Sequence, residues 1–204
     1  MESQKKLVVG LRERNRRTAM RDTQREALRL FYERGFTHVS VDEIATNLGM
    51  AASTVFRHFG TKEALVLWDE HDSALEEALT KKLTETVKGE SPFYILRDVF
   101  IDTLASRYRE DLEFELQRVR LIYQTEALHA AAIEAQFTDR EELTAALKQL
   151  LTPRHENAAS LLAGAALLAL DAAVERWQAA NGKDDLGTLV HEAFTTLETL
   201  ASVR

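Results

Sequence analysis

Apolar side chains recur at intervals of three and four residues along most of the 204-residue chain. This spacing places them on one face of an α-helix, and no stretch alternates apolar and polar residues as a half-buried strand does. Pro92, Pro153 and the pair Asn181-Gly182 mark places where helices start or stop. The pattern therefore predicts an all-α fold.

The apolar positions also predict where the helices lie. We expect residues 1–11 to be mobile and the first helix to follow a basic cluster that begins at Arg12. A long helix after Thr61 is expected to act as a mechanical joint, and its apolar stripe consists of Leu65, Trp68, Leu75, Leu79 and Leu83. Thr138 followed by Glu141 predicts another helix start. The remaining helices are expected near residues 12–34, 41–48, 52–59, 92–108, 112–123, 157–180 and 185–202, with breaks at 88–92 and 152–153.

Residues 41–61 predict two short helices that meet at an angle. Ser40 precedes the first helix and Glu43 follows three residues later, the reciprocal arrangement that satisfies free N–H groups at a helix start. Gly49 supplies a position where a positive φ costs little, so the chain can turn sharply there. Val55 and Phe59 then face inward from the second helix. This spacing is typical of a helix-turn-helix, whose second helix enters the major groove of DNA.

Several segments around this motif resemble the tetracycline-repressor (TetR) family of bacterial transcription regulators. They are Ala-Leu-Arg-Leu-Phe at 27–31, Arg-Gly-Phe at 34–36, Val-Asp-Glu-Ile-Ala at 41–45 and Thr-Val-Phe-Arg-His-Phe-Gly-Thr-Lys-Glu-Ala-Leu at 54–65. Residues 161–177 are also similar to the C-terminal domain of relatives that include the mycofactocin-system regulator. The resemblance implies a three-helix DNA-binding domain at 12–63 and a helical ligand-binding and dimerisation domain at 64–204. It further implies that the last two helices form a homodimer interface.

The resemblance implies a set of DNA contacts. Its members are Ala51, Ala52, Ser53 and Arg57 at base edges, Thr54, Phe56, His58 and Lys62 along the phosphates, and Ser40, Arg16 and Arg17 as further DNA-binding candidates. Phe56 stands where the family usually has tyrosine, so a phosphate-donating hydroxyl is missing. Arg57 is the strongest candidate for reading guanine. Two alternatives stay open: the arginines form a solvated basic tail, or His58 caps Phe59 as a buried side chain.

The resemblance also implies a ligand cavity in the C-terminal domain. The candidate lining residues are Trp68, Phe100, Tyr108, Arg118, Tyr123, Asp171 and Trp177. Aromatic residues at helical spacing are equally compatible with an ordinary core, and the charged ones with a buried ion pair or an interface salt bridge. The relatives suggest an acyl-CoA or fatty acid as the effector.

Charge is unevenly distributed along the chain. The net charge is −7, yet residues 1–62 contain 12 Lys and Arg against 7 Asp and Glu, whereas the remainder contains 14 against 26. Basic charge is thus concentrated around the predicted recognition helix. The chain has no cysteine, and its 6 histidines do not form a zinc-ligand spacing. We find no phosphate-binding glycine loop or nucleophile elbow, so we expect no enzyme, cofactor or metal.

The remaining expectations concern location and function. The N-terminus has no signal-peptide core, and the apolar run at 158–170 is shorter than the roughly 20 residues that span a bilayer. We therefore expect a cytoplasmic protein without a membrane partner. The predicted function is a homodimeric repressor that leaves its DNA operator when an apolar or acyl-type effector binds. The alternative is a helix-turn-helix protein that a protein partner controls.

Overall fold

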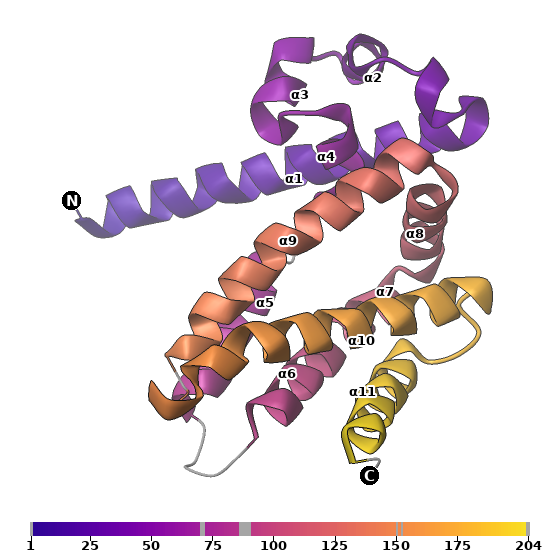
Figure 1. The fold of residues 1–204 in the computed structure, drawn as a ribbon. Coiled ribbons are helices and arrows are strands. Elements are labelled where there is room, and N and C mark those ends of the chain that lie inside the picture. The colour runs from indigo at the N-terminus through magenta and orange to yellow at the C-terminus, as the bar shows by residue number, and fades with distance from the viewer. Residues whose placement is uncertain (1, 70–71, 86–90, 150, 152, 203–204) are drawn as a thin grey trace. The chain divides into compact units, whose positions relative to one another are not determined.

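The computed structural model describes residues 2–69, 72–85, 91–149, 151 and 153–202, and every regular element in these ranges is helical. The all-α prediction is therefore confirmed for this part of the chain (Figure 1). The elements are α1 (Glu2–Arg34), η1 (Phe36–His38), α2 (Val41–Asn47), α3 (Ala52–Phe59), α4 (Lys62–Leu67), α5 (Asp72–Glu85), α6 (Pro92–Phe100), η2 (Ile101–Ala105), α7 (Ser106–Glu110), α8 (Leu112–Gln124), α9 (Glu126–Lys148), η3 (Pro153–Ala158), α10 (Ala159–Ala179) and α11 (Leu186–Ser202).

The chain divides into two compact units. The first unit contains Met1–Glu70 together with Leu121–Ala131, and the second contains His71–Arg120 and Ala132–Arg204. The division differs from the domains expected at 12–63 and 64–204, because α4 and the corner between α8 and α9 belong to the first unit. The corner between α8 and α9 is far from the N-terminal helices in the sequence and joins them only through tertiary packing. Helical periodicity shows which face of a helix is apolar but not which distant segment packs against it.

The first unit is built around α1, the long indigo helix that lies beneath α2 and α3 in Figure 1. The expectation that residues 1–11 precede the helix is wrong, because α1 begins at Glu2. Gly10 is the weakest helix former in this segment, and a single glycine costs a helix only about 1 kcal/mol. The core of the unit includes Met20, Ala27, Leu28, Phe31, Val39, Ile44, Ala45, Val55, Phe59, Leu65, Val66 and Leu128.

The turn between α2 and α3 matches the prediction. Gly49 has φ +65°, and Val55 and Phe59 are buried. Ser40 caps α2 as expected, because its Oγ accepts from the Glu43 N–H at 3.2 Å. The reciprocal half of the predicted cap is wrong: the Glu43 carboxylate instead pairs with Arg34 at the end of α1. An oppositely charged guanidinium competes successfully with a single backbone N–H for a carboxylate.

The predicted joint helix is interrupted. α4 ends at Leu67, Trp68 has an extended backbone with ψ 132°, and α5 begins only at Asp72. The expectation of one helix from Lys62 onward is therefore wrong. In α5, Leu75 is half-buried and Leu79 is buried, whereas the Leu83 side chain lies outside the described residues.

The second unit packs α6, α10 and α11 together. One face of α10 is a row of buried small residues, and these are Ala159, Ala163, Ala166, Ala169 and Ala173. Small side chains let α11 and α6 approach α10 closely. Residues 101–105 form a π-helical segment that the sequence did not predict, and Gly187 lies against it: a Cβ there would be 3.4 Å from Ala105 Cβ. The main core of this unit therefore lies between α6, α10 and α11.

The remaining helix boundaries follow the predictions with one clear exception. The predicted start at Thr138 is wrong, because α9 runs without a break from Glu126 to Lys148 and Thr138 is exposed on it. A Ser/Thr-x-x-Glu pattern marks a helix start only where the chain is not already helical, and no Gly or Pro interrupts α9. Pro92 and Pro153 begin α6 and η3 as expected, while residues 86–90 and 152 of the predicted breaks lie outside the described residues.

The apolar helix α10 (Ala159–Ala179) lies within the predicted range of 157–180, and its apolar character extends beyond the run at 158–170. The stretch Glu156–Ala179 has 24 residues and is long and apolar enough to cross a membrane by length and composition alone. The expectation that it is too short is wrong, because the helix continues through Asp171. Composition cannot separate a membrane span from a helix that packs in a helical domain, and the buried alanine row shows that α10 packs in the second unit.

Candidate functional site

The two faces of α3 differ sharply in exposure. Val55 and Phe59 are buried in the core of the first unit, while Arg57 and Phe56 on the intervening positions are exposed, Phe56 by 47%. At the start of the helix, Ala51 and Ser53 are exposed and Ala52 and Thr54 are half-buried. The structure thus brings these predicted base-edge and phosphate candidates onto one short helix, with Arg57 as its exposed cation.

Positive charge from α1 reaches α3. The charge of Arg16, which is exposed on α1, acts together with that of Arg57 on His58. Burial is the main cause that lowers the pKa of His58, and the two guanidinium groups lower it further. Arg17 is also exposed on α1. Arg16, Arg57 and His58 therefore form a local cluster of basic groups, although they are far apart in the sequence.

His58 is partly enclosed by its own unit. Its Nδ1 is buried without a hydrogen-bond partner, and its ring lies edge-on to the Phe59 ring at a centroid distance of 6.3 Å. The alternative that His58 caps Phe59 as a buried side chain therefore agrees with the contact that the His58 ring makes with Phe59. An imidazole held neutral by burial is poised to gain a proton when an anion approaches.

Lys62 points into the first unit. Its Nζ donates to the Phe36 carbonyl and lies 4.2 Å from the centroid of the Phe36 ring and 5.2 Å from that of Phe31. Burial lowers the pKa of the Lys62 ammonium. An ammonium group has three N–H donors, so the Phe36 contact leaves capacity for a second acceptor. A phosphate contact by Lys62 stays a prediction, as does one by Ser40, whose hydroxyl oxygen already caps α2.

The predicted pocket residues separate into two groups. In the second unit, Phe100 contacts Phe194 at 6.3 Å and Tyr108 contacts Trp177 at 4.9 Å, and all four rings are buried. Asp171 lies half-buried on α10. These residues belong to an aromatic core beside charged groups, and their role as a pocket stays a prediction.

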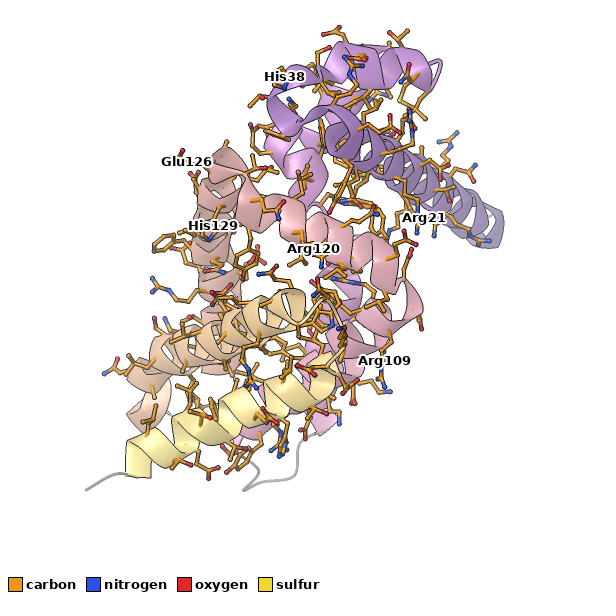
Figure 2. All side chains as sticks on the ribbon, turned by 90° about the vertical axis from the view of Figure 1, so that its right-hand side faces the viewer. Arg21, His38, Arg109, Arg120, Glu126 and His129 are labelled. Atoms are coloured by element: carbon orange, nitrogen blue, oxygen red, sulfur yellow. The ribbon has the colours of Figure 1, made fainter. Side chains whose placement is uncertain are left out.

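Trp68 and Tyr123 belong to the first unit instead. The Trp68 ring lies edge-on to Phe59 at 5.8 Å. The Tyr123 ring lies 5.5 Å from that of His129, which with Glu126 is exposed at the start of α9 (Figure 2). The structure therefore does not gather the seven pocket candidates within one unit.

A buried ionic cluster surrounds Arg118. Glu115 Oε2 accepts from Arg118 Nε at 3.0 Å and from Nη2 at 2.8 Å, and Arg107 Nε lies 3.3 Å from Oε1 of the same carboxylate. All three side chains are less than a tenth exposed. The buried ion pair considered for Arg118 is therefore present, and Arg107 and Glu115 were missed. For Glu115 the available signal was its position three residues before Arg118 on the same mixed helix.

Gln24 was also missed. It is 4% exposed on α1, and its side-chain nitrogen donates to the carbonyls of Leu65 and Trp68 near the end of α4. An uncharged polar residue on the apolar stripe that contains Ala27, Leu28 and Phe31 was the signal that could have revealed it.

Comparisons with known proteins agree with the N-terminal and C-terminal resemblances. Residues 25–67 match the family described as bacterial regulatory proteins, tetR family, and residues 90–201 match the MftR C-terminal domain. The HTH-type transcriptional regulator TcmR of Streptomyces glaucescens is 30% identical over 150 residues. That alignment covers 71% of this chain and 64% of TcmR, so the chain spans less than two thirds of this relative.

Solved structures share the fold. Thermus thermophilus FadR, a TetR family transcriptional repressor in complex with lauroyl-CoA, superposes with a TM-score of 0.55 at 22% identity and covers 91% of this chain and 96% of its own. NalD of Pseudomonas aeruginosa, the secondary repressor of the MexAB-OprM multidrug efflux pump, gives 0.53 at 21% identity with coverages of 92% and 95%. At these identities the likeness establishes the fold alone.

The environment of His58 predicts a pH dependence of stability. Its pKa is lowered below 6.5 in the folded protein, so the unfolded chain takes up this proton more readily. The stabilisation is complete above pH 6.5 and is lost as the pH falls from there toward the folded-state pKa. From about pH 7.5 to about pH 5.5 we expect the wild type to lose more thermal stability than His58→Gln. Replacement of the exposed His38 by Gln is the control, and equal losses in all three proteins would contradict the assignment.

Proposed function

Because this chain belongs to the TetR family of bacterial regulatory proteins, we propose that it is a homodimeric transcriptional repressor that binds a DNA operator through α3. The observation that carries this proposal is the exposed face of α3. Arg57 projects from a helix whose opposite face is held in the core by Val55 and Phe59. A helix fixed in this way can enter the major groove without losing its packing.

Charge supports the same surface. Arg16 and Arg57 act on the same imidazole, and the segment around them is the basic part of an otherwise acidic chain. Phosphates would meet this cluster first, because long-range attraction to DNA depends on local positive charge. Arg57 would then donate two hydrogen bonds to a guanine, whereas Ala51 and Ala52 offer only methyl groups to thymine.

The exposed apolar side chains of α10 and α11 support a homodimer. Leu161 is 76% and Leu168 is 61% exposed on α10, seven residues apart and thus on one face, and Leu200 is 63% exposed on α11. The opposite face of α10 is the buried alanine row. Large apolar side chains that recur on an exposed helix face are typical of an interface. A two-fold dimer would present two α3 helices to two half-sites about one DNA turn apart.

The second unit would bind the effector, and we propose an acyl-CoA or fatty acid. The support is the buried aromatic groups of α6, α7, α10 and α11, the Arg107 guanidinium 5.0 Å from the centroid of the Tyr108 ring, and the presence of lauroyl-CoA in the T. thermophilus FadR structure. The effector would favour a state of the dimer in which the two α3 helices no longer match the half-site spacing. The site of action is then the cytoplasm, where the operator lies.

Replacement of Arg57 by Ala tests the direct readout of the operator. We expect the variant to lose discrimination at one base pair of each half-site, by about 1–3 kcal/mol. The measurement is binding to a panel of single-substitution operators at one salt concentration. Arg29→Ala is the matched control, because Arg29 is exposed on α1 and pairs with Glu26 and Glu33. An unchanged specificity profile for Arg57→Ala would remove this residue from the readout.

Replacement of Leu161 and Leu168 by Glu tests the dimer interface. Two carboxylates on each copy would repel across a two-fold axis and would lose the apolar burial, so we expect a monomer. Sedimentation velocity measures this directly. Tyr32→Glu, which changes a side chain that is 45% exposed on α1, is the control and should remain dimeric. A dimeric double variant would show that this face of α10 is not the interface.

Dodecanoyl-CoA tests the effector class. A ligand at 100 times its Kd stabilises the folded state by about 2.7 kcal/mol. In a chain of this size, each kcal/mol of stabilisation raises the melting temperature by roughly 2–4 °C. We expect a shift of this order together with release of operator DNA, while free coenzyme A produces neither. Absence of any shift with acyl chains of several lengths would reject the acyl effector and leave the DNA-binding function intact.

A further inference from the structure

We propose that Gln24 is a positioning residue that ends α4 and fixes it to α1, and thereby sets the alignment of α3 for operator binding. The DNA readout rests on the proposed function, whereas the clamp itself rests on the hydrogen bonds of the Gln24 side chain. Gln24 Nε2 donates to the carbonyls of Leu65 at 3.1 Å, Val66 at 3.2 Å and Trp68 at 2.6 Å. The residues joined are more than 40 positions apart in the sequence.

The contact satisfies a specific need. The last carbonyls of a helix have no N–H partner within the helix, and a buried carbonyl without a donor is costly. Leu65 and Val66 are fully buried, so water is a poor substitute there. An amide nitrogen has two N–H groups for three acceptors, so at least one N–H is shared between two carbonyls. Gln24 therefore supplies the donors that a continuing helix would have supplied through its next turn.

The same contact explains why the predicted joint helix is interrupted. If α4 continued into α5, each of these carbonyls would accept from an N–H four residues later. The Gln24 amide occupies the acceptors instead, and Trp68 turns to ψ 132°. The two arrangements compete for the same carbonyl oxygens, so the clamp favours the interrupted state. Its loss favours a continuous helix.

The clamp is connected to the recognition helix through short contacts. The Trp68 ring lies against Phe59, the last residue of α3, at 5.8 Å. At the other end of α4, Thr61 Oγ1 accepts from the Ala64 N–H at 2.9 Å and so fixes the start of α4 directly after α3. With both ends held, α4 positions α3 on α1. When the Gln24 donors are absent, the Trp68 end is released and the orientation of α3 is no longer unique.

The test replaces Gln24 by Met, which has similar length and no donor. The chain has no cysteine, so cysteines introduced at the exposed Asn15 on α1 and Ser53 on α3, both in the first unit, accept spin labels without background. We expect one distance population in the labelled wild type and a second population in the Gln24→Met variant. We also expect about tenfold weaker operator binding, the order of one buried hydrogen bond lost.

Thr23→Val is the matched control. Thr23 is the adjacent buried polar residue, and its hydroxyl donates to the Ala19 carbonyl within α1 at 2.7 Å and lies 3.9 Å from Met50 Sδ. Valine keeps the shape of this side chain, so the substitution removes a buried hydroxyl without touching α4. We expect the wild-type distance distribution and operator affinity for this variant. If Thr23→Val reproduces the second population, the effect is general destabilisation and the proposal is overturned.

Two further outcomes are decisive. An unchanged distance distribution and unchanged affinity for folded Gln24→Met would overturn the clamp. If that variant does not fold, Gln24→Asn takes its place, because its amide is one methylene short of the carbonyls, and the same criteria apply. The distance measurement needs no DNA, so a wild type that binds no duplex would reject the proposed function while the clamp is still judged by the distances.

Discussion

Burial of one face of α3 is the constraint on which the first unit depends. Val55 and Phe59 occupy the core beside α1 and α2, and the positive φ of Gly49 allows α3 to leave α2 at the angle that this packing requires. Once those two side chains are inside, Arg57 must face outward. The orientation of the proposed recognition surface is therefore a consequence of core packing rather than of any contact that Arg57 itself makes.

The helix starts and the turn of the first unit could be predicted from sequence because they depend on local signals. Ser40 and Thr61 cap helices because each hydroxyl reaches an N–H three residues later, and the turn at Gly49 depends on one residue. The break after Leu67 could not be predicted in this way, because the group that ends α4 is a side chain on a different helix. The partner of the Glu43 carboxylate was predicted wrongly for the same reason. Its partner Arg34 lies at the end of a different helix, outside the capping pattern, but is close to Glu43 in space.

The second unit was less predictable because a helix such as α10 has apolar side chains on two faces, only one of which packs in the core of the unit. In α10 the alanine row is buried and the leucines at 161 and 168 are exposed, and composition alone cannot say which face meets the core. Periodicity also gave no sign of the π-helical segment before α7 or of the corner that joins the first unit. The proposed pocket set is accordingly divided, with Trp68 and Tyr123 in one unit and the remaining candidates in the other.

The most direct test of the account is the salt dependence of binding between the purified wild-type protein and duplex DNA from the control region of its own gene. The account predicts a dimer that binds this duplex more tightly than an unrelated one, with an affinity that falls steeply as salt rises because bound cations are released from the phosphates. A protein that stays monomeric and binds neither duplex at low salt would contradict it.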